Sequence, residues 1–181
     1  MKNAGKFEKK HVAKECAFLA VFVALVLAVQ LVLSFVPGVE LVTVLFVSYA
    51  FIFGKGRGMV AATAFSLLRQ FVFGVYPTVL VLYVVYFNLL AFSFGALGSK
   101  IKNAPKALWF IVVCACLGTI CFTMADNVLN VLWYGYTGKT AKLYFMSSLP
   151  FMGIQTACTA VSVSVLFLPI IKGLQMAKKG L

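Results

Sequence analysis

Residues 16–36 read CAFLAVFVALVLAVQLVLSFV and contain no charged side chain. A helix rises about 1.5 Å per residue, so a helix over this stretch is about 30 Å long, which matches the hydrocarbon core of a bilayer. A secretory signal has a shorter apolar run and a cleavage site of small residues, and this stretch has neither feature. It therefore predicts a first membrane-spanning helix that stays in the protein.

The whole chain has the composition of an integral membrane protein. Of its 181 residues, 63% are hydrophobic and 11% are charged, whereas soluble domains are about half apolar and a quarter charged. The five cysteines lie in apolar stretches, and we interpret them as packing residues. The single histidine, His11, lies in the basic N-terminal segment. We therefore expect neither a metal site nor a histidine-based catalytic pair within the membrane.

Further apolar stretches follow the first, at about 41–53, 58–75, 78–98, 107–133 and 145–171. The short segments PGVE and GVYP should form tight turns, because proline and glycine favour turn conformations. The predicted fold is an all-α integral membrane protein with six transmembrane helices in residues 16–171. A cytoplasmic basic segment, 1–15, precedes this domain, and a cytoplasmic tail, 172–181, follows it.

The distribution of lysine and arginine predicts the orientation. Six spans place both termini on one side, and 13 of the 16 basic residues then fall on that side. Because basic loops stay in the cytoplasm, both termini are predicted to be cytoplasmic in a multi-pass protein of the bacterial plasma membrane. The net charge of +12 is explained by this topology and by contact with anionic lipid, without nucleic-acid binding.

Polar side chains within the apolar stretches are candidates for a ligand site, because they are costly inside a membrane. Arg69 lies about 16 Å into the third stretch, near the middle of the membrane. Most of the others, including Gln30, fall between the midplane and the outer surface. They predict an outward-facing polar cavity among aromatic walls. The candidate binding residues are Glu40, Arg69, Asn88, Asp126, Asn127, Asn130, Trp133 and Gln155.

Each of these residues also has a structural alternative. Arg69 could form an ion pair with Asp126 or Glu40 inside the membrane. A single asparagine or glutamine could make an interhelical hydrogen bond, worth about 0.6 kcal/mol on average. Trp133 could belong to a belt of aromatic residues at the membrane surface. The clustering of polar residues on one side of the membrane favours the binding site.

The first stretch also carries a stripe of alanines. Ala13, Ala17, Ala20, Ala24 and Ala28 recur three or four residues apart, which places them on one face of a helix. Small residues at this spacing let another helix approach closely. That helix belongs either to a partner protein or to this chain.

These features resemble the substrate-binding S components of energy-coupling factor (ECF) vitamin transporters. The resemblance covers the chain length, the six expected spans, the basic termini and the alanine-rich first helix. Residues 36–58, VPGVELVTVLFVSYAFIFGKGRG, are similar to the region of the first two helices in that family. The resemblance implies a six-helix bundle that binds a vitamin or a vitamin precursor from its outer side.

The resemblance also implies partners. An alanine-x-x-x-alanine motif, which is Ala20/Ala24 or Ala13/Ala17 here, would dock on a membrane coupling subunit that sits on two ATP-hydrolysing subunits. The chain would then be no enzyme and need no cofactor of its own, and it has no glycine-rich nucleotide loop of the G-x-x-x-x-G-K-[ST] type. Cobalamin is the favoured cargo, with riboflavin and pyridoxine-type vitamins also open.

Other classes of membrane protein remain as alternatives. A stand-alone secondary carrier or channel would need polar residues through the inner half of the spans and often has an internal repeat, and the sequence shows neither clearly. A membrane enzyme would need a base and a nucleophile at membrane depth. A structural membrane subunit would bind no ligand.

Overall fold

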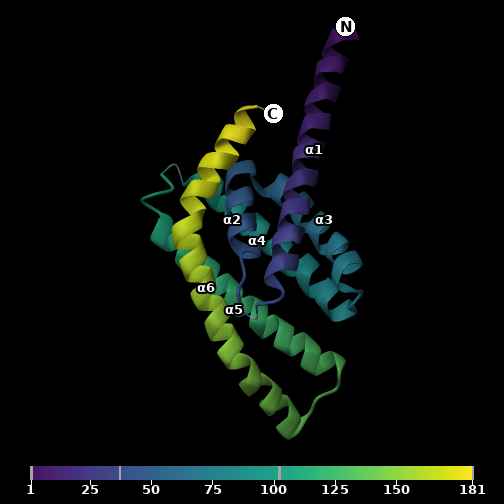
Figure 1. Cartoon of the computed structure of the whole chain (residues 1–181), viewed down its shortest axis with the longest axis vertical. Coiled ribbons are helices and arrows are strands. Elements are labelled where there is room, and N and C mark those ends of the chain that lie inside the picture. The colour runs from purple at the N-terminus through teal and green to yellow at the C-terminus, as the bar shows by residue number, and fades with distance from the viewer. Residues whose placement is uncertain (1, 37, 102, 181) are drawn as a thin grey trace.

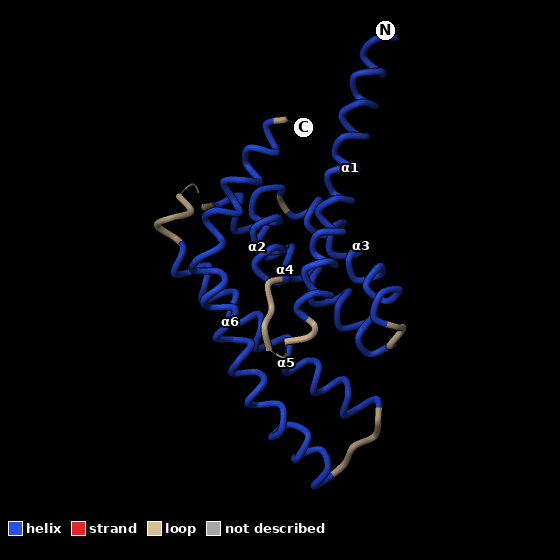
Figure 2. Tube along the Cα trace, viewed as in Figure 1, coloured by secondary structure: helices blue, strands red, loops and turns tan. Residues whose placement is uncertain are grey.

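The computed structural model describes residues 2–36, 38–101 and 103–180, and their side chains from residue 12 onward. Within these ranges the fold is all-α, as predicted, with helices joined by short loops (Figure 2). The helices are α1 (Lys2–Leu33), α2 (Val42–Phe53), α3 (Lys55–Phe73), α4 (Pro77–Lys100), α5 (Leu108–Trp133) and α6 (Gly138–Lys179) (Figure 1). Residues 1 and 181, at the ends of the predicted N-terminal segment and tail, and Pro37 of the PGVE turn lie outside the described residues.

Helices α1, α4, α5 and α6 are long and apolar enough to cross a membrane. Helix α2 has only 12 residues. Helix α3 has 19 residues but carries Lys55, Arg57 and Arg69, and it is not among these four. The structure is therefore compatible with a membrane protein of at least four spans, and the two further spans stay a prediction.

The helices at the two ends of the chain are longer than the predicted spans. Helix α1 already begins at Lys2, and α6 continues to Lys179, so both the basic N-terminal segment and the tail are largely helical. Helix α6 also runs through Pro150 and Pro169, although proline removes a backbone hydrogen bond from a helix interior. The apolar pattern marked only the apolar part of these helices, because their polar ends carry no hydrophobic signal.

The short helix α2 is the centre of the fold. Nearly all of its residues are buried, and it packs against α4, α6 and α3. A helix that is apolar on all sides belongs in a core. Its aromatic rings extend the packing to the neighbouring helices. The ring of Tyr49 stacks on Phe22 of α1 with 4.1 Å between centroids, and Phe46 meets Phe65 of α3 edge-on at 5.1 Å.

Helices α2 and α3 are joined by one residue, Gly54, and α4 packs closely against this corner. Gly54 has φ +83°, a left-handed conformation that glycine adopts without steric cost. A Cβ atom on Gly95 of α4 would lie 2.5 Å from the backbone nitrogen of Lys55, and one on Gly98 would collide with the backbone carbonyl of Phe51. The two glycines therefore let α4 approach the α2–α3 corner.

Helices α5 and α6 form a hairpin that extends past the rest of the bundle (Figure 1). Hydrogen bonds from every fourth residue of α5 join the two helices. The pairs are Thr119 with Thr159 at 3.0 Å, Thr123 with Gln155 at 3.2 Å, and Asn127 with Ser148 at 2.6 Å. Interhelical hydrogen bonds of this kind contribute about 0.6 kcal/mol each on average in membrane proteins, so together they help to align the hairpin.

Candidate functional site

A cavity of about 260 Å³ lies where α1 ends and α2 begins, away from both chain termini (Figure 1). The connection between α1 and α2 forms one wall, and α3, α4, α5 and α6 each contribute side chains. Its polar lining residues are Gln30, Ser34, Glu40, Arg69, Tyr83 and Gln155. The predicted residues Glu40, Arg69 and Gln155, which are far apart in the sequence, therefore come together in one cavity.

Arg69 is held by two aromatic rings, and part of its hydrogen-bonding capacity is unused. Its guanidinium carbon lies 4.8 Å from the ring centre of Phe73 and 4.2 Å from that of Tyr83. A cation–π contact contributes about 0.5–2 kcal/mol, depending on how far the pair is removed from water. Among the described residues, the buried Nε and Nη1 atoms of Arg69 have no hydrogen-bond partner.

The structural alternative for Arg69, an ion pair with Asp126 or Glu40, is not formed. Within the described side chains, the salt bridge found is between Arg57 and Glu15, whose Nη2 and Oε1 atoms are 2.5 Å apart. Those two side chains are substantially exposed. The charge of Arg69 thus faces the cavity without a carboxylate beside it.

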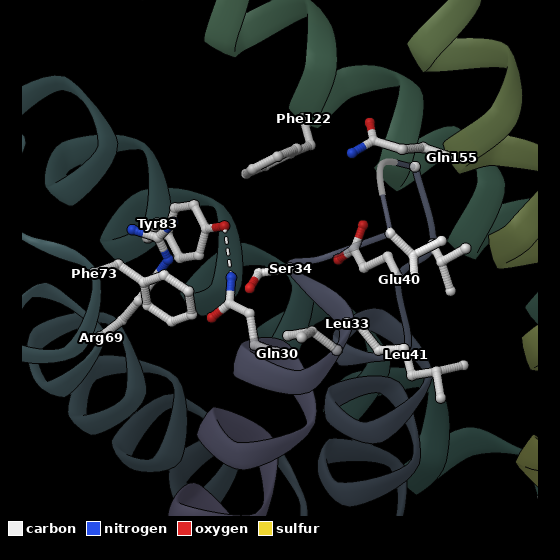
Figure 3. A pocket seen from close by; sticks show the side chains of 14 residues that line it. Gln30, Leu33, Ser34, Glu40, Leu41, Arg69, Phe73, Tyr83, Phe122 and Gln155 are labelled. Atoms are coloured by element: carbon white, nitrogen blue, oxygen red, sulfur yellow. Dashed lines mark hydrogen bonds between the residues drawn. The ribbon is translucent and has the colours of Figure 1, made fainter.

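Glu40 lies on the other side of the cavity from Arg69, Phe73 and Tyr83 (Figure 3). It comes from the α1–α2 connection, where its Oε1 atom accepts a hydrogen bond of 3.0 Å from the hydroxyl of Thr43. The bond to Thr43 leaves further lone pairs of the carboxylate free to accept from a ligand.

Gln30 lies between these two sides of the cavity (Figure 3). Its Nε2 atom donates to the hydroxyl of Tyr83 at 3.0 Å. Its buried Oε1 atom has no partner among the described residues. Gln30 therefore positions one of the rings that hold Arg69, and it also presents an acceptor of its own.

A second cavity, of about 380 Å³, lies between α5 and α6. It is lined by Asp126 and Asn127, and it shares Phe122 and Gln155 with the first cavity. Asn130 donates to the carboxylate of Asp126 at 3.0 Å. The two groups of predicted residues, one around Arg69 and one around Asp126, are thus neighbours that meet at a shared pair of side chains.

Three of the predicted residues line neither cavity: Asn88, Asn130 and Trp133. Asn88 bonds with Thr63 across α3 and α4, with its Nδ2 atom 3.0 Å from the threonine hydroxyl, so it has the interhelical role that was its structural alternative. Trp133 is 63% exposed at the end of α5 and lines neither cavity, a position that agrees with the alternative of an aromatic belt.

The sequence did not single out Phe73, one of the two rings beside Arg69, as a binding residue. Phe73 follows Arg69 by four residues, and residues at this spacing share a face of a helix, so the pattern contained a usable signal. Tyr83 and Phe122 come from other helices, and nothing in the sequence pairs them with Arg69. No three His, Cys, Asp or Glu side chains gather for a metal ion in the parts of the chain that the structure describes.

The alanine stripe lies on an open face of α1. Ala13, Ala17, Ala20 and Ala24 are all exposed, while the opposite face of α1 packs against α3 and α2. Val21, which lies beside the stripe, is 68% exposed. Of the two interpretations of the stripe, packing against another helix of this chain does not occur among the described residues.

No protein-family model, curated protein or solved structure matches this chain. The function is therefore argued from the cavities, their charges and the open face of α1.

Proposed function

We propose that this chain is the substrate-binding S component of an ECF-type transporter in a bacterial plasma membrane. In this proposal it captures a vitamin or a vitamin precursor from outside and passes it to partner subunits that hydrolyse ATP. The observation that carries the proposal is the cavity around Arg69. A charged side chain with unpaired N–H groups is costly in an apolar bundle unless a ligand uses it.

Two buried serines in the core of the bundle support capture over a continuous channel. Ser48 in α2 and Ser66 in α3 are fully buried, and their hydroxyls donate to carbonyls of their own helices at 2.7 Å. Hydroxyl groups used in this way do not line an aqueous path. A pocket of this kind suits a subunit that binds its ligand on one side of the membrane and releases it later on the other.

The open face of α1 supports a membrane partner. In lipid, helices associate through close packing of small residues, because there is no hydrophobic gain from leaving the lipid. The exposed alanines around Ala20 and Ala24 provide such a surface. The proposed occupant is the coupling subunit of an ECF module, and two ATPase subunits complete that module.

The volumes of the two cavities constrain the size of the transported molecule. Sites for drug-sized ligands have volumes of roughly 300–1,000 Å³. The first cavity has about 260 Å³ and the second about 380 Å³. Cobalamin, the cargo favoured on the sequence, is much larger than such ligands and would have to fill and widen both cavities, whereas a smaller vitamin would fit within the first.

Mass spectrometry of small molecules retained by the purified protein tests the capture function. We expect a vitamin or precursor in about one-to-one ratio with the protein. The matched control is the Arg69→Gln variant, purified identically, which should retain less of the same compound. A wild-type protein that retains no small molecule, and binds none from a defined vitamin mixture, would refute the proposal.

Docking is tested by introducing tryptophan on the open face of α1. Ala20→Trp with Ala24→Trp should abolish co-purification of a coupling subunit and vitamin uptake, while the purified protein still binds its ligand. Leu117→Trp is the matched control, because Leu117 is 55% exposed on α5, away from the stripe. Normal co-purification of the double variant would show that the stripe is not the docking surface.

A further inference from the structure

We propose that the ligand of the first cavity is a small dipolar molecule. Its anionic group binds Arg69, and an N–H donor at its far end binds Glu40. This inference rests on the proposed function and names the substrate class of the same site. It follows from the charges on the two sides of the cavity, from their separation and from the size of the space between them.

The first step concerns the charge at Arg69. The guanidinium group stays protonated in proteins, and a buried charge needs a counter-charge and hydrogen-bond partners. The rings of Phe73 and Tyr83 hold the cation, while its buried Nε and Nη1 atoms have no partner among the described residues. In the described part of the chain, neither Glu40 nor Asp126 forms a salt bridge with it. An anionic ligand group would supply what these neighbours do not.

The second step concerns the opposite side of the cavity. The carboxyl oxygens of Glu40 are acceptors, and the bond from Thr43 uses only part of this capacity. Gln30, which lies between the two sides, adds a further acceptor to the lining, its unpaired Oε1 atom. The free lone pairs of Glu40 can accept a hydrogen bond from a donor at the far end of the ligand.

The third step concerns size and shape. The space between Arg69 and Glu40 is part of a cavity of about 260 Å³, below the usual range for drug-sized ligands. The rings of Phe73, Tyr83 and Phe122 line it, and Figure 3 shows Phe122 above the gap between the two charged side chains. A compact molecule with charge at one end and N–H groups at the other fits this arrangement, whereas a cation or a large macrocycle does not.

Equilibrium dialysis with a defined mixture of vitamins tests the substrate class. The full-length protein in detergent or lipid nanodiscs is dialysed against equal concentrations of biotin, pantothenate, thiamine, riboflavin, pyridoxine and cobalamin. Biotin combines a carboxylate with N–H groups at its far end, and pantothenate combines a carboxylate with an amide N–H and two distant hydroxyl groups. We expect one of the two, biotin first, to be retained. Retention of only thiamine, riboflavin, pyridoxine or cobalamin would overturn the dipolar ligand and leave the proposed function standing. No retention would refute both.

Variants test the two ends separately. Arg69→Gln should weaken binding of the retained compound by about 10- to 100-fold, since hydrogen bonds to charged groups contribute about 1.5–3 kcal/mol. Glu40→Gln should weaken it by about 10-fold. The matched controls are Arg57→Gln and Glu15→Gln, because these side chains form the exposed salt bridge outside the cavity. They should leave binding unchanged.

A neutral analogue distinguishes direct contact with the anion from a structural effect of the substitution. The carboxylate-free analogues are biotinamide for biotin and pantothenol for pantothenate. The wild type should bind the analogue about 10- to 100-fold more weakly than the parent compound, and Arg69→Gln should discriminate little between the two. Equal discrimination by both proteins would overturn the assignment of the anion to Arg69, even if the variant binds weakly overall.

Discussion

Arg69→Met should raise the thermal stability of the ligand-free protein. The substitution removes a guanidinium group whose buried Nε and Nη1 atoms have no partner among the described residues, and it leaves an apolar side chain of similar length. An unsatisfied buried donor costs about 1–3 kcal/mol. Removing two of them should therefore contribute roughly 2–6 kcal/mol to stability.

The loss of the aromatic contacts opposes this gain. The guanidinium lies 4.8 Å and 4.2 Å from the ring centres of Phe73 and Tyr83, and two cation–π contacts contribute about 1–4 kcal/mol in total. Taking the middle of each range, the net stabilisation is about 1–2 kcal/mol. For a chain of this size, that corresponds to a rise in melting temperature of roughly 2–8 °C.

The assay is thermal unfolding in detergent, followed by intrinsic fluorescence, after exhaustive dialysis to remove ligand. Arg57→Met is the matched control. It breaks an exposed salt bridge, and such pairs contribute about 0–1 kcal/mol, so its melting temperature should barely change. A variant at Arg69 that melts clearly below both proteins would refute the reasoning, because Arg69 would then be stabilised by its own surroundings. With ligand present, the order of wild type and variant should reverse.

Two further substitutions test the packing that positions the site. Gly98→Ala should destabilise the protein by about 1–3 kcal/mol, as overpacked sites do. The control is Gly173→Ala, where an added Cβ has no neighbour within 4 Å, and this variant should be neutral or stabilising by up to about 1 kcal/mol. Equal melting temperatures of the two variants would contradict the close approach of α4. Thr119→Val should lower the stability of the protein by about 1 kcal/mol, because it leaves the hydroxyl of Thr159 unpaired. Adding Thr159→Val should recover most of that loss. Additive losses in a double-mutant cycle would show that the two hydroxyls do not interact.

The long apolar stretches predicted much of the fold, because a long uncharged stretch of this kind most readily forms a membrane-spanning helix. The predicted ends were accurate for α2 and α5, where apolar residues stop abruptly at Phe53 and Trp133. They were too short for α6, whose polar ends continue the helix beyond the apolar part. The central burial of α2 was not predicted, since an apolar run looks the same whether lipid or protein surrounds it.

Three polar residues of the candidate site were predicted from the sequence, but the side chains that surround them were not. Glu40, Arg69 and Gln155 stood out because a polar side chain in an apolar stretch is conspicuous, and all three line one cavity. The same criterion selected Asn88, which lies outside the cavity and donates a hydrogen bond to Thr63. Sequence alone does not tell a polar side chain that is already paired from one that is free, and that difference separates a structural residue from a binding one.

The length of α2 sets how deep the site lies. Twelve residues make a helix of about 18 Å, and a hydrocarbon core is about 30 Å thick. With the basic corner at Gly54 placed at the cytoplasmic surface, as the charge distribution predicts, Val42 at the start of α2 would lie about 12 Å below the opposite surface of the lipid. Non-helical backbone at such depth is tolerated where protein or water surrounds it, and in this placement the α1–α2 connection would form the floor of the proposed binding site. Under the proposed function, the thickness of the membrane, which the protein does not control, would then set how far a solute travels from bulk water to reach Arg69.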